Sequence, residues 1–364
     1  MHYYTGESAY TKNLAMLTDL FALARARYLF ITEIARHPWC STETVVSGFS
    51  RLAQALRDHQ DIVDNLFASL PREFPFTKSP VPRLDTGTPQ ERRAYVFREQ
   101  KRYIDWQGSL NITVECRDDE SHTRSVREII KVITPMNVCG AEKIRIGGEG
   151  DGGYVMLDPG KGGIAYSLGV SWNAPWDLEM ARRGFTVYQY DGSIDQEPDK
   201  HPNIFFHKCF VGAHESNGRP CKSFKQILAE NQHQNEKNLI LQMDIEGAEW
   251  EVFEELSAED LLRFSQIIVE LHEVHLHVYK YALLSKIRRT HTPIHVHYNN
   301  YVRDVILSQR NSLIYSGSLI EVSYVRTCDH TFAPCRDYFP TALDRPCVPH
   351  RPEIPIGCFD LMPT

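Results

Sequence analysis

The sequence lacks an uninterrupted hydrophobic run long enough to cross a membrane, which takes roughly 18 apolar residues. Its most apolar stretch, from Leu14 to Ile34, is interrupted by Asp19, Arg25, Arg27 and Glu33 and has the pattern of an amphipathic helix. For the same reason the N-terminus does not resemble a secretory signal. We therefore expect a cytoplasmic protein without a membrane span; a secretory lumen is the alternative if a leader is missing and the cysteines form disulfides.

An excess of positive charge is also missing, because 40 Lys and Arg face 47 Asp and Glu, for a formal net charge of −7. Proteins that bind nucleic acid by neutralising its phosphates need a basic surface, so we predict no nucleic-acid partner. The 364 residues are 42% hydrophobic and 24% charged, as in globular enzymes. This length suffices for one large α/β domain with an appendage, and the composition indicates no oligomeric state.

None of the nine cysteines forms a C-x-x-C pair, and the spacing typical of zinc ribbons and fingers is missing. Four of the nine lie in a Pro-rich C-terminal tail: Cys328, Cys335, Cys347 and Cys358. Disulfides would hold such a tail together in a secretory lumen, whereas buried free thiols are expected in the cytosol. The sequence leaves both alternatives open.

The chain changes character near residue 125. Before it, helical patterns over Tyr10–Arg36, Thr42–Leu66 and Glu91–Trp106 surround the Pro-rich stretch Pro71–Pro89. After it, short β-branched runs alternate with helical patterns, which indicates βα units in a mostly parallel sheet. We predict three regions: a helical N-terminal accessory region of residues 1–124, an α/β catalytic domain of 125–327, and a tail of 328–364 packed on that domain.

Seven strands are predicted for the α/β domain, at residues 164–168, 186–190, 204–207, 239–243, 266–271, 294–297 and 319–325. Two shorter strands flank the glycine-rich segment 147–153. In a doubly wound sheet, ligands bind at the carboxyl ends of the strands, near the point where the strand order reverses. The polar residues that follow these strands are therefore the first candidates for a functional site.

The first strand ends at Gly169, and the second ends at Asp191, 22 residues later. In nucleotide-binding sheets a glycine lets the ligand approach the backbone, and a carboxylate about 20 residues on accepts hydrogen bonds from ribose hydroxyls. The glycine fingerprint for a pyrophosphate is missing, which favours S-adenosylmethionine over NAD. An ordinary turn followed by a surface aspartate is the alternative.

Carboxylates also follow the fourth and fifth strands. Asp244 and Glu246 lie where cofactor and substrate would meet, although capping of the next helix would account for one of them. Glu270 and His272 share a face of the fifth strand. The later charge run, which includes Glu249, is interpreted as a solvated helix face.

The sixth strand contributes His295 and His297, again on a common face. Together with the preceding carboxylates they form a cluster that can act as a general base or hold a divalent cation such as magnesium. We predict His272 as the base, with His297 as the second choice, and Asp244 and Glu246 as groups that orient the substrate. The predicted metal ligands are Asp244, Glu270 and His295.

Seven segments in order resemble the FkbM-type and methyltransferase-like S-adenosylmethionine-dependent enzymes: Asp151–Val155, Tyr166–Val170, Trp176–Leu178, Tyr190–Asp191, Met243–Trp250, Glu270–His272 and His295–Asn300. The resemblance spans roughly Lys143 to Arg326. It implies a class I, Rossmann-like methyltransferase sheet of seven strands with the last one antiparallel. It also implies O-methylation of a small-molecule or glycan acceptor, such as a sugar or natural product.

Seven cofactor-binding residues follow from the matching motifs: Gly148, Asp151, Gly152, Gly169, Ser171, Asp177 and Asp191. Two positions depart from the family: Gly192 stands where related chains tend to have histidine, and Pro175 interrupts the turn before the first helix. A catalytically inactive cofactor- or glycan-binding protein, a nicotinamide oxidoreductase and a metal-dependent hydrolase remain alternatives.

Overall fold

The computed structural model describes residues 87–109, 115–116, 120–212, 221–274, 278–301, 305–308, 313–316, 319–349 and 351–361. The chain divides into two compact units, Met1–Ser79 and Pro80–Thr364, and the described residues belong to the second. The helical patterns predicted for Tyr10–Arg36 and Thr42–Leu66 lie outside them. The boundary predicted after residue 124 lies within the helix α6 (Glu120–Ile133).

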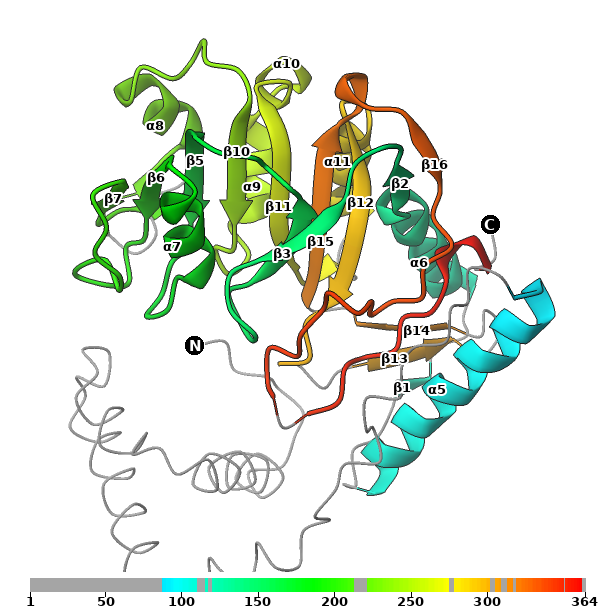
Figure 1. The fold of residues 1–364 in the computed structure, drawn as a ribbon. Helices are drawn as coiled ribbons and strands as arrows, with labels where there is room; N and C mark the ends of the chain where they lie inside the picture. Colours follow the sequence, from blue (N-terminus) through cyan, green and yellow to red (C-terminus); the bar gives the residue numbers. More distant parts are fainter. Residues whose placement is uncertain are drawn as a thin grey trace, which may run out of the picture. The chain divides into compact units, whose positions relative to one another are not determined.

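The second unit is built on a seven-stranded sheet with the order β12-β15-β11-β10-β5-β6-β7 (Figure 1). Every neighbouring pair in it is parallel except those of β15, which runs antiparallel to both β11 and β12. The predicted Rossmann-like sheet with an antiparallel last strand is therefore confirmed. Its strands are β5 (Gly163–Leu168), β6 (Phe185–Tyr190), β7 (Ile204–His207), β10 (Leu239–Met243), β11 (Phe264–His272), β12 (His291–Tyr298) and β15 (Leu319–Arg326).

Helices connect these strands, as the sequence predicted: α7 (Pro175–Arg182), α8 (Phe224–Glu230), α9 (Glu249–Glu255), α10 (Ala258–Leu261) and α11 (Val278–Arg288). Pro175 does not interrupt the turn before α7. It is the first residue of the helix, where a proline is favoured because the missing N–H would have no partner in the helix. No helix within the described residues is long and apolar enough to cross a membrane.

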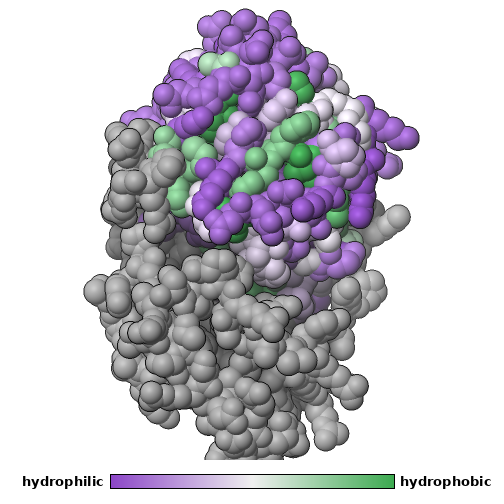
Figure 2. All heavy atoms as spheres, turned by 90° about the vertical axis from the view of Figure 1, so that its left-hand side faces the viewer, coloured by the Kyte–Doolittle hydropathy of each residue, from purple (hydrophilic) through white to green (hydrophobic). Residues whose placement is uncertain are grey.

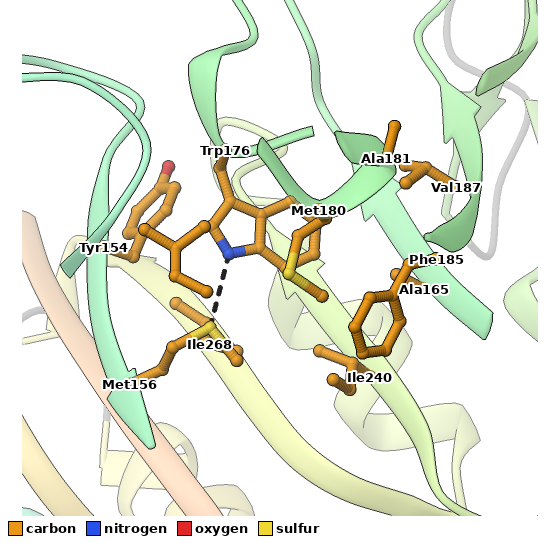
Figure 3. Packing of buried hydrophobic residues seen from close by; sticks show 11 residues of the cluster. Tyr154, Met156, Ala165, Trp176, Met180, Ala181, Phe185, Val187, Ile240 and Ile268 are labelled. Carbon is orange, nitrogen blue, oxygen red and sulfur yellow. Dashed lines mark hydrogen bonds between the residues drawn. The ribbon is translucent and has the colours of Figure 1, made fainter. Parts of the chain in front are cut away.

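A hairpin of β3 (Lys143–Ile146) and β4 (Tyr154–Leu157) lies over the same face of the sheet as α7 (Figure 1). Trp176 of α7 packs between the hairpin and the sheet, and its Nε1 donates to the sulfur of Met156 at 3.4 Å (Figure 3). Ile240 and Ile268 face this cluster from the sheet. The apolar contact fixes the hairpin, and with it the glycine-rich loop 147–153, beside the start of α7.

The sequence did not predict three small sheets at the periphery. They comprise β1 (Glu115–Cys116) with β13 (Val305–Ser308) and β14 (Leu313–Ser316), β2 (Met136–Val138) with β16 (Phe332–Pro334), and β8 (Phe210–Val211) with β9 (Cys221–Lys222). Strands of two to four residues give no recognisable alternation in a sequence. Figure 2 views the molecule from the β7 side, where hydrophilic residues surround a narrow band of hydrophobic ones.

The C-terminal tail packs on the sheet unit and on helix α5 (Pro89–Ser109), which contains the predicted helical segment Glu91–Trp106. Arg92 of this helix makes two hydrogen bonds of 2.7 Å to the carboxylate of Asp360. The structure has the four tail cysteines, Cys328, Cys335, Cys347 and Cys358, as free thiols.

Candidate active site

Asp191 connects the loops that follow the first two strands of the sheet. Its Oδ2 accepts hydrogen bonds from the backbone N–H groups of Val170 and Ser171, at 2.9 and 2.7 Å. Its Oδ1 accepts from the backbone N–H and the hydroxyl of Ser193, both at 2.6 Å. A carboxylate offers about four acceptor sites, and these donors occupy them. A ribose hydroxyl can therefore bind Asp191 only by displacing a donor, most simply the Ser193 hydroxyl.

Gly169 lies at the closest approach of β5 to β10. Its φ is +82°, and a Cβ added there would stand 1.6 Å from the carbonyl oxygen of Asp244. Only glycine permits this contact. The predicted cofactor residue Gly169 and the predicted substrate residue Asp244 are thus direct neighbours, at the point where the strand order of the sheet reverses.

The predicted glycine-rich loop packs on α7. A Cβ at Gly152 would lie 3.0 Å from the ring of Pro175, and one at Gly148 would lie 3.7 Å from it. Close packing and a φ of +75° account for Gly152, whereas a side chain at Gly148 would make only an ordinary contact with Pro175. Asp151, in the same loop, lies near Glu321 of β15. Burial and the charge of Glu321 raise the pKa of its carboxyl group.

Asp177, a further predicted cofactor residue, is 4% exposed and points into the domain. Its Oδ1 accepts a 2.8 Å hydrogen bond from the side chain of Gln189 on β6. Burial raises the pKa of this carboxyl group to about 6. Its contacts join α7 to the sheet.

The predicted carboxylate and imidazole cluster is present around His272. The ring Nδ1 lies 3.1 Å from Oε1 of Glu249, and Nε2 lies 3.5 Å from Oε2 of Glu246. Nε2 is also 3.8 Å from Oδ1 of Asp244 and 3.7 Å from Oε1 of Glu270. One imidazole thus stands among four carboxylates, which converge from the ends of β10 and β11 and from the start of α9.

These charges decide the protonation states. Burial alone would lower the pKa of His272, but hydrogen bonds with Glu246 and Glu249 and the charges of Glu249 and Glu270 raise it to about 11. The ring is therefore a cation near neutral pH and has no free site for a proton, which argues against the predicted general base. Burial raises the pKa of Asp244 to about 7, although the charge of His272 opposes this shift. Burial and the charges of Asp244 and Glu321 also raise the pKa of Glu270.

The predicted metal triad of Asp244, Glu270 and His295 is not assembled. His295 instead places its Nε2 2.7 Å from Oδ1 of Asp344 in the tail. Within the described ranges, two other groups bring three potential ligand atoms within 4.8 Å of one another: Asp244, Glu246 and His272 in one, and His297, Glu321 and Cys347 in the other.

Comparison with known proteins agrees with this arrangement. A family described as "Methyltransferase domain" matches residues 99–326. The chain belongs to this methyltransferase family. The match includes the whole seven-stranded sheet and the segments Lys143–Arg326 that carry the FkbM-type resemblance. No curated protein matches the chain.

The candidate site includes two residues that sequence reasoning missed. Glu249 is fully buried rather than solvated: it accepts hydrogen bonds from the backbone N–H groups of Gly247 and His272, at 2.9 and 2.7 Å. Asn299 donates a 2.9 Å hydrogen bond to Oε2 of the buried Glu270. Both residues lay within recognised motifs, Met243–Trp250 and His295–Asn300, but the run of glutamates that follows Glu249 favoured a solvated helix face.

Proposed function

We propose that this methyltransferase uses S-adenosylmethionine and methylates a hydroxyl group of a sugar, glycan or natural product. The observation that carries the proposal is Oδ1 of Asp244, which is buried and has no hydrogen-bond partner. Such an atom costs about 1–3 kcal/mol unless a ligand satisfies it. It lies beside Gly169 at the reversal of the strand order, where doubly wound sheets bind their ligands.

The residues present suit a cationic cofactor. Asp244, Glu246, Glu249 and Glu270 outnumber the single imidazole among them. S-adenosylmethionine supplies a methyl group on a positively charged sulfur. NAD, in contrast, would bring two negative phosphates to a site that has neither a glycine fingerprint nor, in the described cluster, a second cation.

Asp244 is the proposed general base. When ionised, its Oδ1 can take the proton of an acceptor hydroxyl, and its pKa of about 7 is close to the value that suits a base at neutral pH. His272, as a cation, holds Glu246 and Glu249 in place and is a positioning residue. His297, the second choice for the base, lies between Glu321 and Glu353, and their charges raise its pKa despite its burial. It is therefore also protonated.

Asp244 and Glu246 also offer oxygen ligands to a divalent cation such as magnesium, which prefers carboxylates. Cation binding would require His272 to lose its proton or to swing away, because its Nε2 lies 3.5 Å from Glu246. Magnesium is therefore a variable of the binding experiment rather than part of the proposed proton transfer.

The proposal is tested by calorimetric titration of the purified chain with S-adenosylmethionine and with NAD, each with and without magnesium. We expect S-adenosylmethionine alone to bind, with a Kd of about micromolar. Asp191→Asn should weaken this binding by about tenfold, since one hydrogen bond to a ribose hydroxyl contributes roughly 1.4 kcal/mol. Asp158→Asn, at the opposite edge of the sheet, is the control and should bind as the wild type does.

Failure of the folded wild-type chain to bind S-adenosylmethionine would contradict the proposal. Binding without transfer to any glycan or small hydroxyl acceptor would instead favour the catalytically inactive alternative. Equal affinity in wild type and Asp191→Asn would remove Asp191 from the cofactor site.

A further inference from the structure

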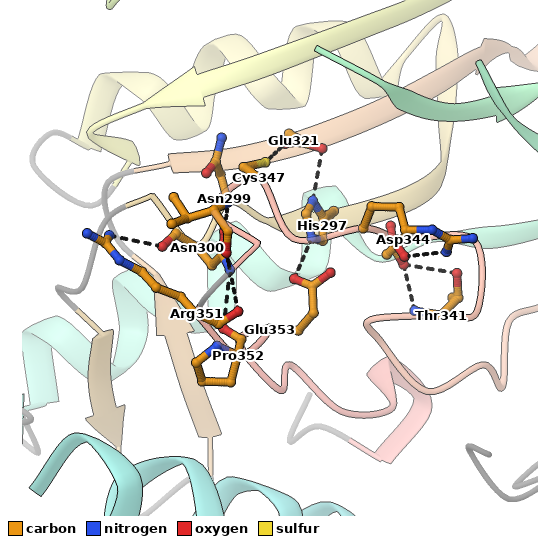
Figure 4. A network of polar contacts seen from close by, with 12 residues as sticks. His297, Asn299, Asn300, Glu321, Thr341, Asp344, Cys347, Arg351, Pro352 and Glu353 are labelled. Atoms are coloured by element: carbon orange, nitrogen blue, oxygen red, sulfur yellow. Dashed lines mark hydrogen bonds and ion pairs between the residues drawn. The ribbon is translucent and has the colours of Figure 1, made fainter. Parts of the chain in front are cut away.

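Three potential metal ligands meet beneath the C-terminal tail, outside the acidic site around His272 (Figure 4). His297 and Glu321 are opposite each other in the β12–β15 ladder, and the tail lays Cys347 against them. Nδ1 of His297 lies 3.0 Å from Oε2 of Glu321, and Sγ of Cys347 lies 3.4 Å from Oε1 of the same carboxylate. The three side chains belong to three different elements and meet only in the folded chain.

These distances are close to those of a metal site. Zinc binds nitrogen and oxygen at about 2.0–2.2 Å and sulfur at about 2.3 Å, in tetrahedral geometry. Ligand atoms in such a site are then about 3.3–3.6 Å apart. The observed 3.0 and 3.4 Å need only small adjustments of side chains. An imidazole, a thiolate and a carboxylate together are a donor set that suits zinc better than magnesium or calcium.

A second observation concerns the far side of the imidazole. Nε2 of His297 lies 3.0 Å from Oε2 of Glu353. A histidine that binds a metal nearly always donates its other N–H to a carboxylate or carbonyl, which fixes the ring and makes the bound nitrogen a better donor. Glu353 meets this requirement, and His297 is only 2% exposed, so its orientation is fixed by its two partners.

The local charge also favours a bound cation. The carboxylates of Glu321 and Glu353 both contact the one imidazole. A buried excess of negative charge is costly unless a cation balances it. A divalent ion would provide that charge.

We propose that His297, Glu321 and Cys347 bind one zinc ion that fastens the C-terminal tail to β12 and β15. The Cys347 thiol and Nδ1 of the His297 imidazolium both release a proton to solvent when the ion binds. This site goes beyond methyl transfer and does not depend on it.

The test is a cobalt titration of the chelator-treated full-length chain without S-adenosylmethionine. Cobalt occupies tetrahedral zinc sites, and its bond to a thiolate gives a charge-transfer band in the near ultraviolet. We expect one equivalent of cobalt to bind with this band, and zinc to displace it. Cys347→Ser should abolish the band and weaken binding by about 100-fold or more, and Glu353→Gln should weaken it by about 10- to 100-fold. Cys335→Ser removes another buried thiol of the same tail and should leave both unchanged.

The proposal is overturned if the folded wild-type chain binds no cobalt, or if Cys347→Ser retains the band. It is also overturned if binding shows no charge-transfer band and is lost on Glu246→Gln, because the ion would then occupy the acidic site. The titration contains no cofactor, so a chain that binds cobalt but not S-adenosylmethionine would contradict only the proposed function.

Discussion

Asp244→Asn should lower kcat for methyl transfer by about 100-fold or more, because an amide has the shape of the carboxyl group but cannot take the proton of the acceptor hydroxyl. Oδ1 of Asp244 is buried and has no hydrogen-bond partner, so it is available to accept that proton. Glu254→Gln is the matched control, since Glu254 is an exposed carboxylate on α9 and should show wild-type kcat.

The pH dependence adds a second readout. A base works only when ionised, so kcat of the wild type should rise with pH through about 7, the pKa of Asp244, and fall off in acid. This rise should be absent from Asp244→Asn. An unchanged kcat, or a variant that keeps the same pH profile, would show that Asp244 is not the base.

His272→Gln separates the base from the residue that positions it. The positive charge of His272 lowers the pKa of Asp244, so its removal should move the rise of kcat to higher pH without abolishing it. If His272 were the base, as the sequence alone suggested, its substitution would lower kcat by about 100-fold at every pH. The two pH profiles therefore distinguish the two assignments.

Strand positions and faces could be predicted because they depend on local sequence. Each predicted strand of the main sheet is present within two or three residues of its expected ends, and Glu270 and His272 do share a face. The alternation of side chains in a strand is a property of the backbone, so it survives in almost any environment. For the same reason Asp244 lies, as predicted, at the carboxyl end of its strand.

Partners and protonation states could not be predicted in the same way. His295 is 49 residues from Asp344, and the Pro-rich tail has no periodic pattern that would place that carboxylate. The protonation state of His272, the predicted base, depends on its partners in the same way. Its pKa depends on Glu249, whose burial follows from the turn at Gly247 rather than from the helix pattern.

The pair of Asp344 and His295 leads to the largest expected loss of stability. Asp344 is 7% exposed and accepts a 2.7 Å hydrogen bond from His295 Nε2. It also accepts hydrogen bonds from the N–H and hydroxyl of Thr341, at 2.6 and 2.9 Å (Figure 4). Asp344→Ala leaves these donors buried without an acceptor, and breaking a buried pair in this way costs about 3–5 kcal/mol. Urea unfolding at neutral pH measures this loss. Asp158→Ala, which removes an exposed ion pair with Arg183, should cost less than about 1 kcal/mol.

Acid should reduce the difference in the free energy of unfolding between Asp344→Ala and the wild type. Burial alone would raise the pKa of Asp344, but the charge of His295 and the bonds from His295 and Thr341 hold it well below its usual value. A carboxyl group whose pKa is lowered by folding stabilises the protein above its unfolded pKa of about 3.9, and this contribution is lost as the pH falls further. The free energies of unfolding should therefore begin to converge below about pH 4 and approach each other as the pH falls towards the lowered pKa of Asp344. A constant difference down to acid would mean that the variant loses packing of the tail rather than the charge of Asp344.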